Sequence, residues 1–124
     1  MYPSLLKSAI IALALSSAEG VSAAQTAPGG ETLFRQRCGS CHAVQAGQNR
    51  VGPSLHGVFG RRAGAVAGYN YSPALRAWGQ NWTAANLERY VAGTRATVPG
   101  TKMSIVAPPP AQRTEIIRYL QSLR

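Results

Sequence analysis

The sequence predicts an all-α domain with a large irregular fraction. Four segments show helical periodicity, and no segment shows the convincing alternation of a β-strand. Residues 43–70 and 94–110 have no sustained period, and loops of that length are uncommon in a small domain unless they wrap something. With only two Phe and two Trp beside 13 Gly, the chain has limited apolar area to offset chain entropy. This composition points to a cofactor that fills the middle of the domain.

The first helix is expected from about Glu31 to Cys41, directly after Gly29-Gly30. Within it, Phe34, Cys38 and Cys41 stand at positions i, i+4 and i+7, a spacing that puts them on one face. Both cysteines of the chain are therefore expected on the same side of one helix.

Three further helices are expected from their start and stop residues. One begins at Ser72-Pro73, because serine is a good N-cap and proline suits the first helical position, and it stops at Gly79. Another begins after Thr83 and ends at Gly93, and the last follows the run 108–110. The helix after Thr83 has apolar residues at helical spacing at Leu87, Tyr90 and Val91. The last helix has them at Ile116, Ile117, Leu120 and Leu123.

At 124 residues the chain has room for one domain. Residues 1–23 have the pattern of a secretory signal peptide, with Lys7 before the short apolar run Ala9–Leu15 and small residues at 21–24. An uncleaved membrane anchor is the alternative, but spanning a bilayer takes about 20 apolar residues and this run is far shorter. We expect cleavage near residues 23/24, export to the periplasm and a mature domain of residues 24–124.

The chain is strongly basic, with 13 Lys and Arg against four Glu, no Asp and a formal net charge of +9. Such a balance suits nucleic acid, an acidic membrane surface or an acidic protein, and solubility alone is the plainest explanation. Export argues against nucleic acid, and the sequence contains no nucleic-acid-binding motif.

The segment Cys38-Gly39-Ser40-Cys41-His42 contains both cysteines and one of two histidines. A disulfide would close a tiny loop and constrain little of the unfolded chain, and a thioredoxin-like pair expects a βαβ context. Structural zinc would need all four Cys and His residues of the chain. The spacing C-x-x-C-H is instead the attachment motif for c-type haem. On one helix face the two thiols can add to the two vinyl groups of a porphyrin while His42 reaches the iron.

The iron then needs a sixth ligand or an open position. After removal of the leader, Met103 is the only thioether, although a lone methionine can also be a core gap-filler. His56 is the competing ligand, unless it is an ordinary surface histidine. Methionine together with histidine raises the reduction potential. Because six filled positions leave no site for substrate, this pattern indicates electron transfer rather than catalysis.

The sequence resembles the class I cytochromes c, in the branch of mitochondrial cytochrome c and bacterial cytochrome c2. The resemblance covers residues 30–123, and its motifs follow the family's order. They are Cys38–His42, Gly52–Arg61, Gly68–Ser72, Trp82, Leu87–Tyr90 and Pro99–Met103. The resemblance implies the class I cytochrome c fold, with crossing N- and C-terminal helices, short helices and long loops wrapped around one covalent haem c and its iron. Residues 24–124 would form this monohaem domain.

The resemblance also implies roles for single residues. The carbonyl of Pro53 would accept a hydrogen bond from the second ring nitrogen of His42. Gly30, Phe34 and Tyr119 would form the crossing of the terminal helices. The groups that would satisfy a haem propionate are Arg61, Tyr71 and Trp82, and the groups near Met103 and the second propionate are Tyr90 and Thr101.

The sequence departs from the family's usual pattern in two places. Leu75 stands where mitochondrial relatives usually have an asparagine in a water-linked network near the methionine. The usual ring of lysines around the haem edge is thinner, since Ala96 and the stretch 105–110 supply no cations. The cations that match the ring are Arg37, Arg95 and Lys102. We expect a smaller docking surface, with arginines that hold carboxylates bidentately.

The predicted function is that of a soluble, monomeric periplasmic carrier that shuttles single electrons between acidic redox partners and is not an enzyme. The runner-up is a dedicated cytochrome c subunit of one periplasmic dehydrogenase complex, for which the apolar segment 105–110 is the only support. A further alternative is a peroxidase or a gas-binding haem protein, which needs an open iron.

Overall fold

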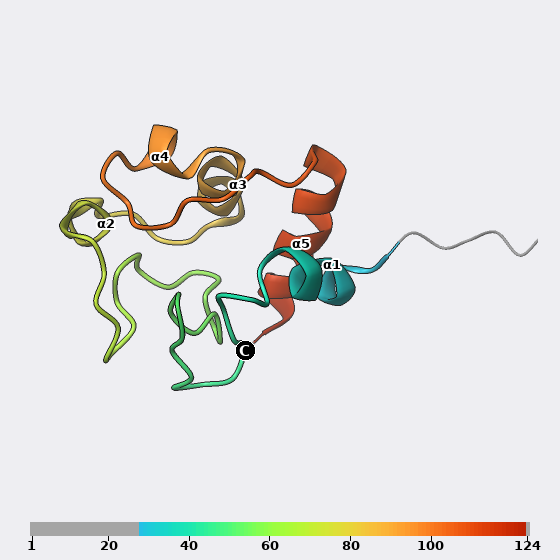
Figure 1. The fold of residues 1–124 in the computed structure, drawn as a ribbon, viewed down its shortest axis with the longest axis horizontal. Helices are drawn as coiled ribbons and strands as arrows, with labels where there is room; N and C mark the ends of the chain where they lie inside the picture. The colour runs from blue at the N-terminus through green and yellow to red at the C-terminus, as the bar shows by residue number, and fades with distance from the viewer. Residues whose placement is uncertain (1–27, 124) are drawn as a thin grey trace, which may run out of the picture.

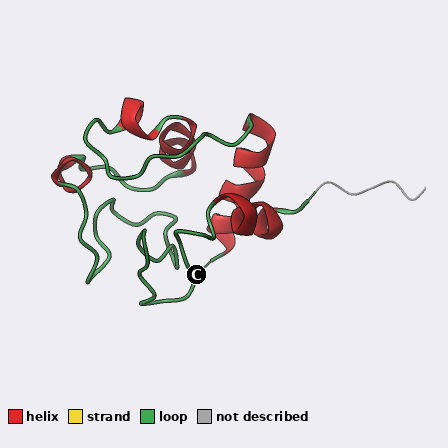
Figure 2. Ribbon diagram, viewed as in Figure 1, coloured by secondary structure: helices red, strands yellow, loops and turns green. Residues whose placement is uncertain are grey.

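A computed structural model describes residues 28–123 of the chain as helices joined by long loops (Figure 1). The helices are α1 (Gly30–Arg37), α2 (Pro73–Ala77), α3 (Ala84–Ala92), α4 (Thr94–Thr97) and α5 (Pro110–Ser122). These residues form no strand, and their one β-bridge is the isolated pair Arg62 and Asn81. The prediction of an all-α fold with a large irregular fraction is confirmed (Figure 2). The predicted leader, residues 1–23, lies outside the described residues.

Helices α1 and α5 cross at one side of the molecule (Figure 1). At the crossing, a Cβ atom on Gly30 would overlap the carbonyl oxygen of Glu115 and lie 2.8 Å from Cβ of Tyr119. The rings of Phe34 and Tyr119 pack with their centroids 5.6 Å apart. The expected crossing of the terminal helices is therefore present, and a glycine is what lets the two backbones approach.

The starts of α2 and α3 follow the predicted caps. The Ser72 hydroxyl accepts the N–H of Leu75 at 3.1 Å, and the Thr83 hydroxyl accepts the N–H of Asn86 at 3.1 Å. After α2 the chain passes through Gly79 with φ of +73°, a left-handed conformation that a residue with Cβ rarely adopts. Local side-chain chemistry thus sets where both helices begin and where the chain leaves α2.

Two elements differ from the sequence-based expectation. Helix α1 ends at Arg37, four residues before Cys41, because the chain turns tightly over the last helical turn. A Cβ atom on Gly39 would lie 2.7 Å from the carbonyl oxygen of Arg35, so only glycine fits this turn. The second difference is α4, which lies in a region expected to be irregular. Its four residues are too few to show a helical period in the sequence.

The core joins α3 to the long loops. Trp82 lies just before α3 and packs on Tyr90 within α3, with ring centroids 5.0 Å apart. Val58 and Tyr71 of the loops are buried with them, so the loops contribute to the core rather than lying over it. The helices among residues 28–123 are all too short or too polar to span a membrane.

Replacing Gly30 by alanine should destabilise the protein through overpacking of the α1–α5 crossing. We expect Gly30→Ala to lower the free energy of unfolding by about 1–3 kcal/mol. Gly29→Ala is the matched control, because a Cβ atom there meets nothing within 4 Å. Denaturant unfolding measures both variants, and equal stabilities for the two would contradict the tight contact at Gly30.

Candidate functional site

The segment Cys38–His42 forms one helical turn beyond the end of α1. The N–H groups of Cys41 and His42 both donate to the carbonyl of Cys38, at 3.1 and 3.0 Å. The second of these is the i→i+4 bond of an α-turn. The two cysteines and the histidine therefore keep the three- and four-residue spacing of a helix face, although the helix itself ends earlier.

Both thiols of this turn are free and partly buried. Burial, with a smaller contribution from Cys41, raises the pKa of the Cys38 thiol to about 11. A thiol with a raised pKa is protonated at neutral pH and is a poor redox nucleophile. The electrostatics of Cys38 are thus opposite to those of a thioredoxin-like redox pair.

The ring of His42 is held in one orientation and one tautomer. It is 9 % exposed, and its Nδ1–H donates to the carbonyl of Pro53 at 2.8 Å. A Cβ atom on Gly52 would overlap Cε1 of this ring, so the ring packs directly against glycine backbone. Burial lowers the pKa of His42, although the hydrogen bond to Pro53 opposes the shift. The ring is therefore neutral at neutral pH, with the Nε2 lone pair free for a metal.

Arg61 presents a buried hydrogen-bond donor that has no acceptor. Its Nη1 donates to the carbonyl of His56 at 2.8 Å and its Nη2 to the carbonyl of Ser54 at 3.1 Å. Its Nε, by contrast, is the one buried side-chain nitrogen or oxygen within residues 28–123 that lacks a hydrogen-bond partner. Burial lowers the pKa of the guanidinium. A buried charged donor without an acceptor is suited to bind an anionic group, such as a haem carboxylate.

Trp82 and Tyr71 both interact with Arg61, the first through backbone hydrogen bonds and the second through the guanidinium charge. Backbone hydrogen bonds of 2.8 Å join Trp82 to Arg61 and to Gly60. The Tyr71 hydroxyl accepts the N–H of Val66 at 3.1 Å, which leaves its own hydrogen free to donate. Burial raises the pKa of Tyr71, and the charge of Arg61 partly offsets this rise. The structure thus pairs Arg61 with Trp82 and leaves Tyr71 protonated at neutral pH, close enough for the charge of Arg61 to act on it.

Met103 lies in the loop between α4 and α5, where it packs half-buried against the same core as Cys38. Two residues earlier, the hydroxyls of Thr101 and Tyr90 form a hydrogen bond, which ties the loop to α3. Burial raises the pKa of Tyr90, so this phenol keeps its proton at neutral pH. The ring contact between Tyr90 and Trp82 links the Met103 loop to the group around Arg61.

The predicted docking cations and His56 lie at the surface. Arg37, Arg95, Lys102 and His56 are all exposed. Arg37 donates to the side chain of Gln112 at 3.1 Å, and Lys102 donates to the carbonyl of Asn70 at 2.6 Å. None of these three cations forms an ion pair with a glutamate of the described residues. Leu75, the departure from the family pattern, is buried in α2.

Sequence reasoning missed the residues that hold the Pro53 loop. The Ser54 hydroxyl donates to the carbonyl of Gln45 at 2.6 Å, and the Ser54 N–H donates to the side chain of Asn49 at 3.0 Å. Asn49 in turn donates to the carbonyl of Ala67 at 3.1 Å and so joins two loops. No periodicity or motif marks Asn49, because its partners are backbone groups of distant loops.

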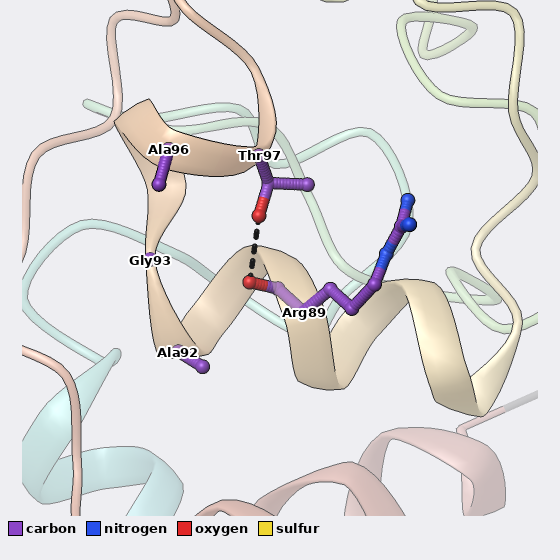
Figure 3. Close-up of a pocket in the computed structure, with 5 residues that line it drawn as sticks. All are labelled: Arg89, Ala92, Gly93, Ala96 and Thr97. Atoms are coloured by element: carbon purple, nitrogen blue, oxygen red, sulfur yellow. Dashed lines mark hydrogen bonds between the residues drawn. The ribbon is translucent and has the colours of Figure 1, made fainter.

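An open surface pocket at the α3–α4 junction holds no predicted site residue (Figure 3). Its lining is Arg89, Ala92, Gly93, Ala96 and Thr97. The Thr97 hydroxyl donates to the carbonyl of Arg89 at 2.8 Å, which ties α4 to the end of α3. The candidate site residues lie elsewhere, at His42, at Arg61 with Tyr71 and Trp82, and in the loop that carries Met103.

The comparisons with known proteins agree on one family. The family model described as cytochrome c matches residues 27–124. The cytochrome c of Cochliobolus lunatus is 40% identical over 94 residues, which cover 74% of this chain and 87% of that protein. Cytochrome c2 of Rhodopila globiformis is 45% identical over 96 residues, which cover 77% and 91%. The solved structure of cytochrome cH from Methylobacterium extorquens is 39% identical, with a TM-score of 0.69, and the match covers 75% of this chain and 94% of that chain.

A side chain at position 52 should displace the imidazole of His42. We expect Gly52→Ala to lower the free energy of unfolding by about 1–3 kcal/mol, because its Cβ atom has no room beside the ring. Gly93→Ala is the control, since its Cβ atom would make only an ordinary contact with Ala96 at 3.5 Å. Chemical denaturation compares the two variants. If Gly52→Ala were as stable as Gly93→Ala, the ring would not be confined as described.

Proposed function

Because the chain belongs to the cytochrome c family, we propose that it is a monomeric periplasmic carrier of single electrons, with His42 and Met103 as the two axial ligands of its haem iron. The family's cofactor is a covalent c-type haem, and its activity is electron transfer between redox partners rather than catalysis. When bound, the haem supplies an iron that gains and loses one electron.

The orientation of His42 is the observation that carries this proposal. The hydrogen bond to Pro53 occupies Nδ1 and leaves Nε2 as the nitrogen that would bind the iron. Cys38 and Cys41 lie in the same helical turn as free thiols, and each would form one thioether link. A neutral ring and two unoxidised thiols are the forms that this attachment requires.

Met103 is the better candidate for the second axial ligand. It is the only methionine of residues 28–123, and the Thr101–Tyr90 hydrogen bond fixes the loop that presents it. His56 is exposed, and the hydrogen bonds of its backbone to Ser54 and Arg61 hold its segment at the surface. With His42 and Met103 as ligands, both held by the fold, the iron would have no position open to a substrate.

The residues around Arg61 would hold the haem propionates. Its unpartnered Nε would provide a charged donor, the Tyr71 hydroxyl has a hydrogen free to donate, and Trp82 is joined to Arg61 through its backbone. Tyr90 and Thr101 would serve the Met103 side and the second propionate. Donors placed in this way compensate the cost of burying a carboxylate.

The surface charges support docking to acidic redox partners. The three glutamates of residues 28–123 are each paired with an arginine, whereas the exposed cations Arg37, Arg95 and Lys102 are not. Residues 28–123 thus present unpaired cations and no unpaired glutamate, and a surface of this kind attracts acidic proteins.

The alternative of a dedicated dehydrogenase subunit has one observation in its favour. Ile105 and Val106 are 38% and 89% exposed, so the segment after Met103 presents apolar side chains to a neighbour. Periplasmic location rests on the leader pattern of residues 1–23 and on attachment chemistry that is completed in an exported compartment.

Removing the thioether should change the ligation of the iron. In Met103→Ala we expect the far-red sulfur-to-iron band of the oxidised protein to disappear and the reduction potential to fall. The iron should become high-spin or take His56 as a replacement ligand, and Met103→Ala/His56→Ala should be high-spin. Optical spectra and redox titration measure these changes. His56→Ala alone should keep the band, and a band that survives in Met103→Ala would exclude Met103 as the ligand.

The exposed cations should accelerate reaction with anionic redox partners. We expect the rate constant for oxidation of the reduced protein by ferricyanide, measured by stopped flow, to fall steeply as ionic strength rises. A triple variant with glutamine in place of Arg37, Arg95 and Lys102 should react several-fold more slowly at low salt. A second triple variant removes the same net charge at exposed arginines that also form no ion pair with a glutamate of residues 28–123, namely Arg62, Arg76 and Arg89. Equal slowing of the two would assign the effect to net charge rather than to a docking surface.

A further inference from the structure

The loop that carries Met103 is fastened to helix α3 at two points. On the N-terminal side of Met103, the hydroxyl of Thr101 bonds to the hydroxyl of Tyr90. On its C-terminal side, Glu88 bonds to Arg113, which also holds the loop at Pro108. Two residues of one helix therefore restrain the loop from both ends.

Arg113 forms the second attachment by bridging three elements. From α5, its Nε donates to Oε1 of Glu88 in α3 at 2.7 Å, and its Nη1 donates to the carbonyl of Pro108 at 2.7 Å. The side chain of Arg113 is only 14% exposed and that of Glu88 is 40% exposed. Pro108 itself is among the most deeply buried residues. One guanidinium thus connects α3, α5 and the end of the Met103 loop.

This ion pair differs from the other two within residues 28–123. Glu31–Arg35 and Glu115–Arg118 are exposed pairs within one helix, at i,i+4 and i,i+3 spacing. Pairs of that kind contribute little to stability. Glu88–Arg113 spans 25 positions, is more buried, and includes a charge-assisted hydrogen bond to backbone. Of the three pairs, it is the one that restrains a functional loop.

We propose that Glu88 and Arg113 are positioning residues for Met103, which hold its loop closed and so control how readily the thioether leaves the iron. The proposal rests on the proposed ligation by Met103. Between the two attachments Ile105 and Val106 are exposed and contribute little packing of their own. Loss of the Arg113 attachment therefore raises the population in which the loop is open, and a competing ligand binds more tightly in proportion to that population.

Imidazole titration of the oxidised holoprotein tests the proposal. Loss of the far-red sulfur-to-iron band reports displacement of Met103, and the titration gives an apparent Kd. We expect Glu88→Ala to bind imidazole roughly threefold to tenfold more tightly than the parent protein. Glu115→Ala is the matched control, because it also replaces a helical glutamate and breaks an ion pair. Its affinity should stay within about twofold of the parent.

A second variant tests whether both residues act through Pro108. Arg113→Met should have a larger effect than Glu88→Ala, because the carbonyl of Pro108 then also loses its donor. The double variant Glu88→Ala/Arg113→Met should bind imidazole no more tightly than Arg113→Met alone, since both substitutions remove one attachment. Additive effects would mean that the two residues act separately, which would overturn the proposal.

Failure of this inference is distinguishable from failure of the proposed function. If the parent protein shows the far-red band but Glu88→Ala and Glu115→Ala bind imidazole equally, Glu88 does not position Met103, although Met103 remains the ligand. If the parent protein lacks the band, the proposed ligation is wrong and the positioning role falls with it. If Glu88→Ala also loses its helical circular dichroism, Glu88→Gln replaces it in the titration, since it removes the charge but keeps an acceptor for Arg113.

Discussion

The hydrogen bond between His42 and the carbonyl of Pro53 is the contact on which the site depends. It occupies one ring nitrogen with a backbone carbonyl and leaves the other free for the iron of the proposed haem, inside a buried environment that keeps the ring neutral. The contact requires Gly52, because any side chain there would meet the ring. It also requires the loop around Pro53 to stay in place, which Ser54 and Asn49 secure.

Helix α3 organises a second part of the proposed haem site. Tyr90 packs on Trp82, whose backbone is paired with that of Arg61, and its hydroxyl reaches Thr101 in the Met103 loop. One turn of this short helix therefore touches the proposed propionate site and the proposed ligand loop together. This arrangement explains how a chain with few large apolar side chains maintains an ordered site. A small number of aromatic and charged residues each connect several segments.

Local chemistry accounts for the parts of the fold that were predictable. The caps at Ser72 and Thr83 act within three residues of the helix start, so their effect is visible in the sequence. The end of α1 was predicted too late, because the tight turn at Gly39 depends on a close approach to Arg35 that composition does not reveal. Helix α4 was missed, since four residues carry no period. The Glu88–Arg113 pair was missed as well, because its partners lie 25 positions apart on separate helices.

The sequence by itself determined the cofactor class and the family, and it supplied the candidate residues for haem binding. These follow from spacing and residue chemistry, since C-x-x-C-H and the one methionine beyond the predicted leader, Met103, restrict the candidate ligands without reference to the rest of the fold. Only the tertiary structure decided how those residues are held. The tautomer of His42, the unpartnered Nε of Arg61 and the two attachments of the Met103 loop all arise from contacts between distant segments. Such contacts depend on where the folded chain brings backbone carbonyls and side chains together, which no local pattern specifies.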